Sequence, residues 1–156
     1  MTDQQNQTGN SSRIVAAFLV LCCGLVLAHG QKTSERFDPD GAFWIYGKPP
    51  TGFEDFSGIN LNSKRSRRLP ASGVDLTNGA KLRFQTLAVK REKLTFTTAI
   101  VRGISFTFSG RFLRGGVFAS ADLDDQTPVL EGTLTKFKGG QKVAEARLRF
   151  TYFGGT

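Results

Sequence analysis

The chain has 156 residues, which is a typical length for one domain, and 21 Lys and Arg against 13 Asp and Glu give it a formal net charge of +8. Both cysteines, Cys22 and Cys23, and the only histidine, His29, lie within the first 30 residues. Without that segment the chain cannot form disulfides, Cys or His metal sites, thiol nucleophiles or histidine-based triads. A basic protein of this kind favours anionic partners.

The N-terminal segment is typical of a secretory signal peptide. Polar residues ending in Arg13 precede an uncharged run over 14–28, and Ala28-His29-Gly30 places small residues where a signal peptidase cuts. We therefore expect residues 1–30 to be a signal peptide and the mature protein to be extracytoplasmic, either periplasmic or secreted. The alternative is an uncleaved membrane anchor over 14–28, although this run is shorter than the roughly 17–25 residues of a membrane span.

Residues 31–72 are expected to be an irregular segment with one short strand and a basic loop. Residues 38–41 (DPDG) have the composition of a turn. Residues 42–46 (AFWIY) form a short apolar run, stopped by Gly47 and two prolines, which predicts a strand. Phe53 and Phe56 follow in a glycine-bounded loop, and we expect both to cover one end of the core.

The only dense charge run lies within this segment, where Lys64, Arg65, Arg67 and Arg68 provide four positive charges in five residues. Such a run is either a solvated loop or a contact for an anionic partner, and it also fits a dibasic processing site of secreted precursors. After export, the expected partner is an anionic envelope surface or polymer and not nucleic acid. Contact with a membrane is expected only through the N-terminal segment.

Residues 73–156 alternate between apolar and polar side chains, and no helical period occurs after residue 30. The predicted strands cover 73–76, 80–89, 93–100, 104–113, 117–123, 129–137 and 141–153. These form one domain with residues 31–72. The fold class is therefore all-β: an antiparallel up-and-down meander of about seven strands plus the short N-terminal strand, curled into a small barrel or a two-layer sandwich.

Glycines predict how these strands are joined. Three-residue loops ending in Gly79, Gly103, Gly116 and Gly140 would place a left-handed residue on glycine and keep the apolar residues of neighbouring strands on one face. The expected pairs are Val74–Leu82, Phe96–Phe108, Ile100–Ile104, Phe112–Phe118, Leu134–Ala144 and Leu130–Leu148. The expected inner stripe is Leu82, Phe84, Leu94, Phe96, Ile100, Ile104, Phe106, Phe108, Phe112, Phe118, Leu130, Leu134, Leu148, Phe150 and Tyr152.

The opposite face of the meander is polar, and its Lys81, Arg83, Arg147 and Arg149 would extend the positive field of the basic loop. Trp44 and Tyr46 share one side of their strand. Such an aromatic pair can stack on a sugar or a base, although it more often belongs to the core.

No phosphate-binding GxxxxGK loop, GxGxxG turn or GxSxG elbow occurs in the sequence, so we expect a non-catalytic protein that needs no cofactor. The weak candidates for a metal site are Asp122, Asp124 and Asp125, which lack the spacing of a calcium-binding loop and also suit a polar turn. The candidates for an apolar ligand are Phe96, Phe106 and Phe108, although side chains usually fill a barrel of this size.

These observations predict an exported, non-catalytic β-domain of the cell envelope or extracellular space, with a binding or structural role. One alternative is a small β-barrel carrier of an apolar ligand. A second is an outer-membrane β-barrel, for which several predicted strands fall short of the ~9–11 residues of a span. A third is an enzyme restricted to carboxylate, hydroxyl and amine chemistry.

Overall fold

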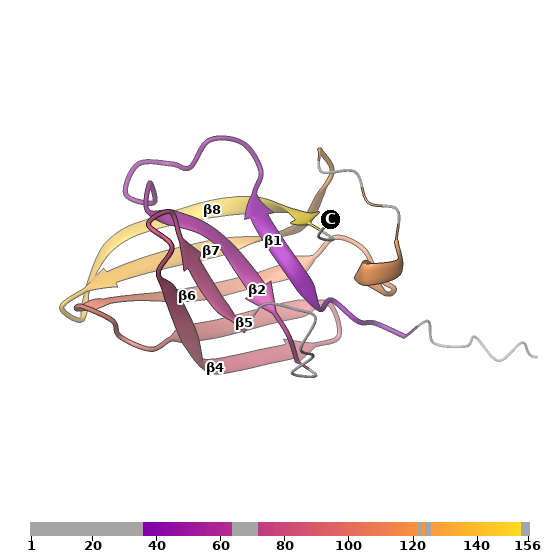
Figure 1. Ribbon diagram of the computed structural model, residues 1–156, viewed down its shortest axis with the longest axis horizontal. Helices are drawn as coiled ribbons and strands as arrows, with labels where there is room; N and C mark the ends of the chain where they lie inside the picture. Colours follow the sequence, from indigo (N-terminus) through magenta and orange to yellow (C-terminus); the bar gives the residue numbers. More distant parts are fainter. Residues whose placement is uncertain (1–35, 64–71, 122, 124–125, 154–156) are drawn as a thin grey trace, which may run out of the picture. The chain divides into compact units, whose positions relative to one another are not determined.

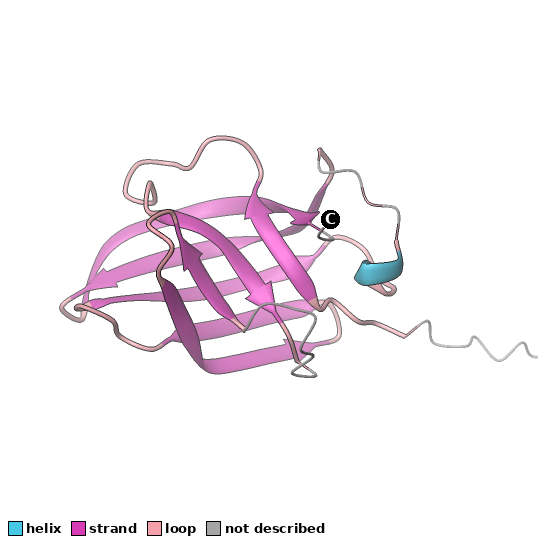
Figure 2. Cartoon of the chain, viewed as in Figure 1, coloured by secondary structure: helices cyan, strands magenta, loops and turns pink. Residues whose placement is uncertain are grey.

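The computed structural model describes residues 36–63, 72–121, 123 and 126–153, all of them within the compact unit Glu35–Thr156. Their strands form an antiparallel meander in which each strand pairs with the next, and the last pairs with the first to close a barrel (Figures 1 and 2). The all-β meander predicted from the sequence is confirmed, and its form is a barrel. No helix among the described residues is long and apolar enough to cross a membrane.

The bounds of the strands follow the predicted ones closely at β3 and β8. The strands are β1 (Gly41–Ile45), β2 (Phe56–Leu61), β3 (Gly73–Leu76), β4 (Lys81–Lys90), β5 (Lys93–Thr98), β6 (Ile104–Phe112), β7 (Pro128–Lys138) and β8 (Gln141–Phe153).

Strand β2 was not predicted, because a β-bulge hides its alternation. The pairing of β2 with β3 shifts register between Phe56 and Gly58. Phe56 and Ile59 are therefore both buried although they are three residues apart. Phe53, which precedes the strand, is also fully buried, so both rings belong to the core, but Phe56 lies in a strand and not in the expected loop.

The predicted strand over 117–123 is wrong, and so is the predicted pair of Phe112 with Phe118. Strand β6 pairs directly with β7 over nine positions, with Phe112 opposite Leu130. Because β7 and β5 already occupy both edges of β6, the residues that follow β6 form a connection containing the short 3₁₀-helix η1 (Phe118–Ser120). This connection crosses the N-terminal residues of the barrel, where the amide of Phe118 donates to the carbonyl of Asp38 at 3.0 Å.

In two hairpins most of the predicted residues face the interior, but the turn is not the predicted three-residue loop. Val101 pairs with Ile104 across the two-residue turn Arg102-Gly103, whose φ angles are 51° and 77°. Both angles are positive, as in a type I′ turn. One extra residue on the β5 side then restores the predicted pair of Phe96 with Phe108, which is confirmed. The predicted pair of Ile100 with Ile104 is wrong, and Ile100 is 68% exposed.

The β7–β8 hairpin also combines a two-residue turn with a one-residue bulge. Gly139 and Gly140 form a two-residue turn with φ angles of 59° and 82°, and a bulge in β8 follows at Val143. Leu134 consequently pairs with Ala146, and Leu130 pairs with Phe150. The predicted pairs Leu134–Ala144 and Leu130–Leu148 are therefore wrong by two residues, although the leucines still face the interior. The predicted Val74–Leu82 pair, across the three-residue loop ending in Gly79, is confirmed.

Substitutions at the turn glycines test these conformations. We expect Gly103→Val or Gly140→Val to lower the free energy of unfolding by about 1–3 kcal/mol, because a β-branched residue resists a positive φ. Gly103→Asn should cost much less, since asparagine tolerates this conformation. Denaturant melts measure both effects. Equal stability of the Val and Asn variants at position 103 would contradict the turn assignment.

Phenylalanine side chains fill the interior. Of the predicted inner stripe, Phe84 and Ile104 are partly buried against the core, Ile100 is exposed and the remaining members are buried. At one end of the barrel the Phe118 ring contacts the rings of Phe37, Phe43, Phe112 and Tyr152, with centroids 5.5–6.2 Å apart. The interior of the barrel is thus mostly apolar and packed with aromatic rings.

Candidate functional site

The candidate site lies on the outer wall where β1 meets β8. Trp44 is the cross-strand partner of Thr151, and the amide of Tyr46 donates to the carbonyl of Arg149 at 2.8 Å. Strand β1 ends at Ile45, and Gly47, with φ of 85°, turns the chain away from the sheet. The edge of β8 is therefore separated from the segment after β1, which leaves a groove between them.

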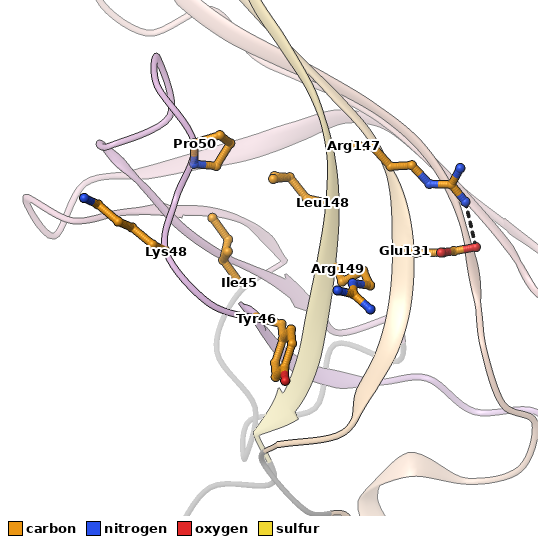
Figure 3. A pocket seen from close by; sticks show the side chains of 8 residues that line it. All are labelled: Ile45, Tyr46, Lys48, Pro50, Glu131, Arg147, Leu148 and Arg149. Carbon is orange, nitrogen blue, oxygen red and sulfur yellow. Dashed lines mark ion pairs between the residues drawn. The ribbon is translucent and has the colours of Figure 1, made fainter.

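The groove has a volume of about 440 Å³ and combines an apolar floor with a charged rim (Figure 3). Ile45 and Leu148 provide the floor, and Leu148 is buried. The complete lining is Ile45, Tyr46, Lys48, Pro50, Glu131, Arg147, Leu148 and Arg149. Because the lining comes from β1, β7, β8 and the loop after β1, the groove depends on closure of the barrel.

Glu131 is the acidic group of the rim, and two arginines share its carboxylate. Its Oε1 atom lies 2.9 Å from Nη2 of Arg111 and 3.0 Å from Nη2 of Arg147, the latter pair drawn in Figure 3. The hydrogen bond from Arg111, supported by the charge of Arg147, lowers the pKa of Glu131 below its usual 4.5. The carboxylate is therefore ionised at neutral pH, and its single negative charge is shared by the two positive charges of Arg111 and Arg147.

Arg149 and Lys48 add positive charge that no described carboxylate neutralises. The guanidinium of Arg149 lies 5.5 Å from the centroid of the Tyr46 ring, a cation–π arrangement that orients the side chain without cancelling its charge. Lys48 is exposed and forms no ion pair with a described residue. The rim thus has an excess of positive charge that is open to solvent.

Exposed aromatic rings continue the site along the wall. Trp44 is 48% exposed, and its ring lies 5.9 Å from that of Phe153, which is 46% exposed. The neighbours of Trp44 on the adjoining strands are Gly58, which has no side chain, and Thr151, whose side chain is small, so the indole stays partly exposed. Trp44 and Tyr46, the residue that follows β1, do lie on the same side of the chain, as predicted, and both are exposed on the outer wall.

The structure brings together only part of the residues singled out from the sequence. Phe96, Phe106 and Phe108 all lie in the packed interior, where each ring contacts another phenylalanine. Two sets lie outside the described residues: Lys64, Arg65, Arg67 and Arg68, and Asp122, Asp124 and Asp125. Across the described ranges, no group of three or more His, Cys, Asp or Glu side chains is arranged to hold a metal ion.

The alternation of side chains in β8 predicted Arg147 and Arg149 on the outer face, but it did not connect them with Lys48 or Glu131. The predicted register put Glu131 opposite Arg147, whereas the bulge in β8 puts it opposite Arg149. The alternation of β7 was a sufficient signal for an outward Glu131 next to an arginine. Lys48 carried no such signal, since its position depends on the path of a loop.

Comparison of the chain with protein families, with curated proteins and with solved structures found no match.

Proposed function

We propose that this protein is an exported binding module that contacts an anionic polymer or surface of the cell envelope or extracellular space through the groove on its outer wall. The observation that carries the proposal is the rim of the groove, where Lys48, Arg147 and Arg149 surround an apolar floor beside exposed aromatic rings. Export is expected from the signal-like segment over residues 1–30.

The distribution of side chains favours this function over the two barrel alternatives. An apolar-ligand carrier needs open interior space, whereas Phe96, Phe106 and Phe108 pack against neighbouring rings. An outer-membrane barrel needs an apolar band on its outer face. The outward positions of β8 instead carry Glu145, Arg147 and Arg149, all exposed.

Retention on anionic matrices tests the proposal. We expect Arg147→Gln/Arg149→Gln to weaken binding about 5–10-fold at low salt, since each exposed charge contributes up to ~1 kcal/mol. Binding of the wild type should fall steeply as salt rises, because screening acts over about 8 Å at 0.15 M. The matched control is Lys90→Gln/Lys138→Gln on β4 and β7, which removes the same net charge from exposed positions away from the groove. Equal losses in both variants would indicate a non-specific effect of net charge and contradict the proposed site.

The ionisation of Glu131 determines how the proposed binding of an anion should depend on pH. Because its pKa is lowered by the hydrogen bond from Arg111, the carboxylate stays ionised until the pH falls below 4.5. Retention of a sulfated ligand, which keeps its charge in acid, should therefore rise only below that pH. Glu131→Gln should reproduce the rise at neutral pH, by about 2–5-fold for one charge. The difference between variant and wild type should disappear in acid, and its persistence would contradict the role assigned to Glu131.

The same lowered pKa has a defined effect on stability. The ion pairs of Glu131 stabilise the folded state above the ordinary pKa of 4.5, and this contribution is lost as the pH falls through the lowered value. Binding in acid should accordingly be measured where far-ultraviolet circular dichroism shows that the barrel is still folded.

The basic run of Lys64, Arg65, Arg67 and Arg68 is proposed as a second contact for the same anionic partner. We expect Arg65→Gln/Arg67→Gln/Arg68→Gln to lower retention at low salt, because clustered charges act together on a polyanion. Unchanged retention would leave the run as a solvated loop and the groove as the contact.

A further inference from the structure

Two rows of hydroxyl side chains cover the outer wall beside the groove. One row crosses four strands from β4 to β7, and its members are Thr86, Thr97, Thr107 and Thr135. The other row crosses three strands, and its members are Thr95, Ser109 and Thr133. All seven line a shallow hollow of about 350 Å³.

The hydroxyl rows lead directly into the groove. Thr133 is the cross-strand partner of Arg147, and Thr135 is the partner of Glu145. The next row of the wall contains Glu131 opposite Arg149, followed by Tyr46. Neighbouring strands are ~4.8 Å apart and alternate residues along a strand ~6.7 Å apart, so hollow and groove are adjacent parts of one surface.

Several of these hydroxyls are available to a ligand. Thr86 and Thr97 bond to each other at 2.7 Å, and Thr135 donates to Glu145 at 3.0 Å. The hydroxyls of Thr107, Ser109 and Thr133 have no hydrogen-bond partner among the described residues. Each hydroxyl supplies one donor and two acceptor sites, and the β-branched threonines hold theirs in restricted rotamers. The hollow is thus a fixed array of neutral donors and acceptors.

We infer that the anionic partner of the proposed function is an acidic polysaccharide, bound as an extended chain across both parts of this surface. Its carboxylate or sulfate groups would meet Arg147 and Arg149, and the apolar face of a sugar ring would lie on Tyr46. Its hydroxyl groups would bond to the threonines of the hollow. A lipid bilayer uses the cations and aromatic rings of such a surface but presents no chain of hydroxyls to the hollow, so the hydroxyl rows favour the polysaccharide.

The inference rests on the proposed function, and variants in the groove and in the hollow test the two claims separately. The probes are polygalacturonate, short galacturonate oligomers, poly-L-glutamate of matched charge, and vesicles containing anionic lipid. We expect Thr107→Val/Thr133→Val to weaken binding of polygalacturonate about 5–20-fold, as for the loss of two hydrogen bonds, and to leave poly-L-glutamate unchanged. Valine suits a strand, so the barrel should fold normally. The matched control is Thr77→Val, which removes an exposed hydroxyl in the loop between β3 and β4.

Chain length provides a second measurement. Thr107 lies in the row of Thr135 and Glu145, which is four residues or ~13 Å along the strand from Arg149, so an oligomer too short to span this distance cannot contact both Arg149 and Thr107. The loss caused by Thr107→Val alone should therefore appear only with long oligomers.

Each remaining outcome overturns a defined part of the argument. If the hydroxyl variants change nothing while Arg147→Gln/Arg149→Gln weakens every anion, the polysaccharide inference is wrong and the anion-binding function stands. Retention on anionic vesicles without binding to polygalacturonate would likewise overturn the inference, in favour of a membrane surface. If Arg147→Gln/Arg149→Gln has no effect on any probe, the proposed function fails as well.

Discussion

Phe118→Ala is expected to lower the free energy of unfolding by about 3–5 kcal/mol. The Phe118 ring is fully buried and contacts the rings of Phe37, Phe43, Phe112 and Tyr152. Its removal leaves a cavity between side chains that come from opposite ends of the chain. Domains of this size are stable by only about 5–15 kcal/mol, so the variant should lose a large part of its stability.

Thermal and denaturant melts measure this loss, with Phe153→Ala as the matched control. Phe153 is 46% exposed, and its truncation should cost less than about 1 kcal/mol. Phe118→Leu should fall between the two variants, because it retains most of the buried apolar volume. If Phe118→Ala melts like the wild type, the connection after β6 does not close the end of the barrel.

Gly132→Ala is expected to cost about 1–3 kcal/mol or more, because the strand has no room for a side chain at this position. A Cβ atom on Gly132 would lie 2.5 Å from the Cα atom of Gly110 and 2.5 Å from the Phe108 ring. It would also lie 2.6 Å from the carbonyl oxygen of Ser109. Gly110 and Gly132 are cross-strand partners, and together they make room for the Phe108 ring inside the barrel.

Two further variants identify the cause of this loss. Gly115→Ala is the control, because a Cβ atom there meets nothing within 4 Å, and its stability should match that of the wild type. Gly132→Ala/Phe108→Leu should recover only part of the stability lost in Gly132→Ala, since the contacts with the backbone of β6 remain. Complete recovery would show that the ring alone limits the space at this position.

Alternation of side chains predicted which face of each strand is buried, but it could not predict how the turns achieve this. A three-residue loop and a two-residue turn followed by a one-residue bulge place the same alternate positions inside. The pattern around Gly103 and Gly140 is therefore compatible with both. The turn with a bulge differs from the three-residue loop only in placing apolar Ile100 and Val143 outward, where each is more than half exposed. Single exposed aliphatic residues are common in proteins, so this difference could not be recognised in the sequence.

In the region after β6, alternation predicted which side chains are buried but not the secondary structure in which they lie. Phe112 and Phe118 are both buried, as predicted, but Phe118 enters the core from a 3₁₀-helix and not from a strand. Long-range pairing of β6 with β7 determines this, and local alternation contains no information about which distant strand is the partner.

The candidate site was partly predictable. Gly47 and the prolines at 49 and 50 predicted where β1 stops, and that stop creates the groove. The outward positions of Arg147 and Arg149 were also predicted. The neighbourhood of Glu131 was not, because a shift of two residues in the β7–β8 register changes its opposite residue without changing the face on which it lies.

The closure of the barrel through β1 and β8 has a consequence for the order in which the structure forms and opens. Every other strand pair joins neighbours in the chain, whereas this pair joins segments about 110 residues apart. The entropy lost in bringing such distant segments together makes this seam the slowest contact to establish. β1 has only five residues, so its amide protons should exchange with solvent before those of β6 and β7. The groove is built on this seam, so partial opening of the barrel would remove the proposed binding surface while most of the sheet stayed intact.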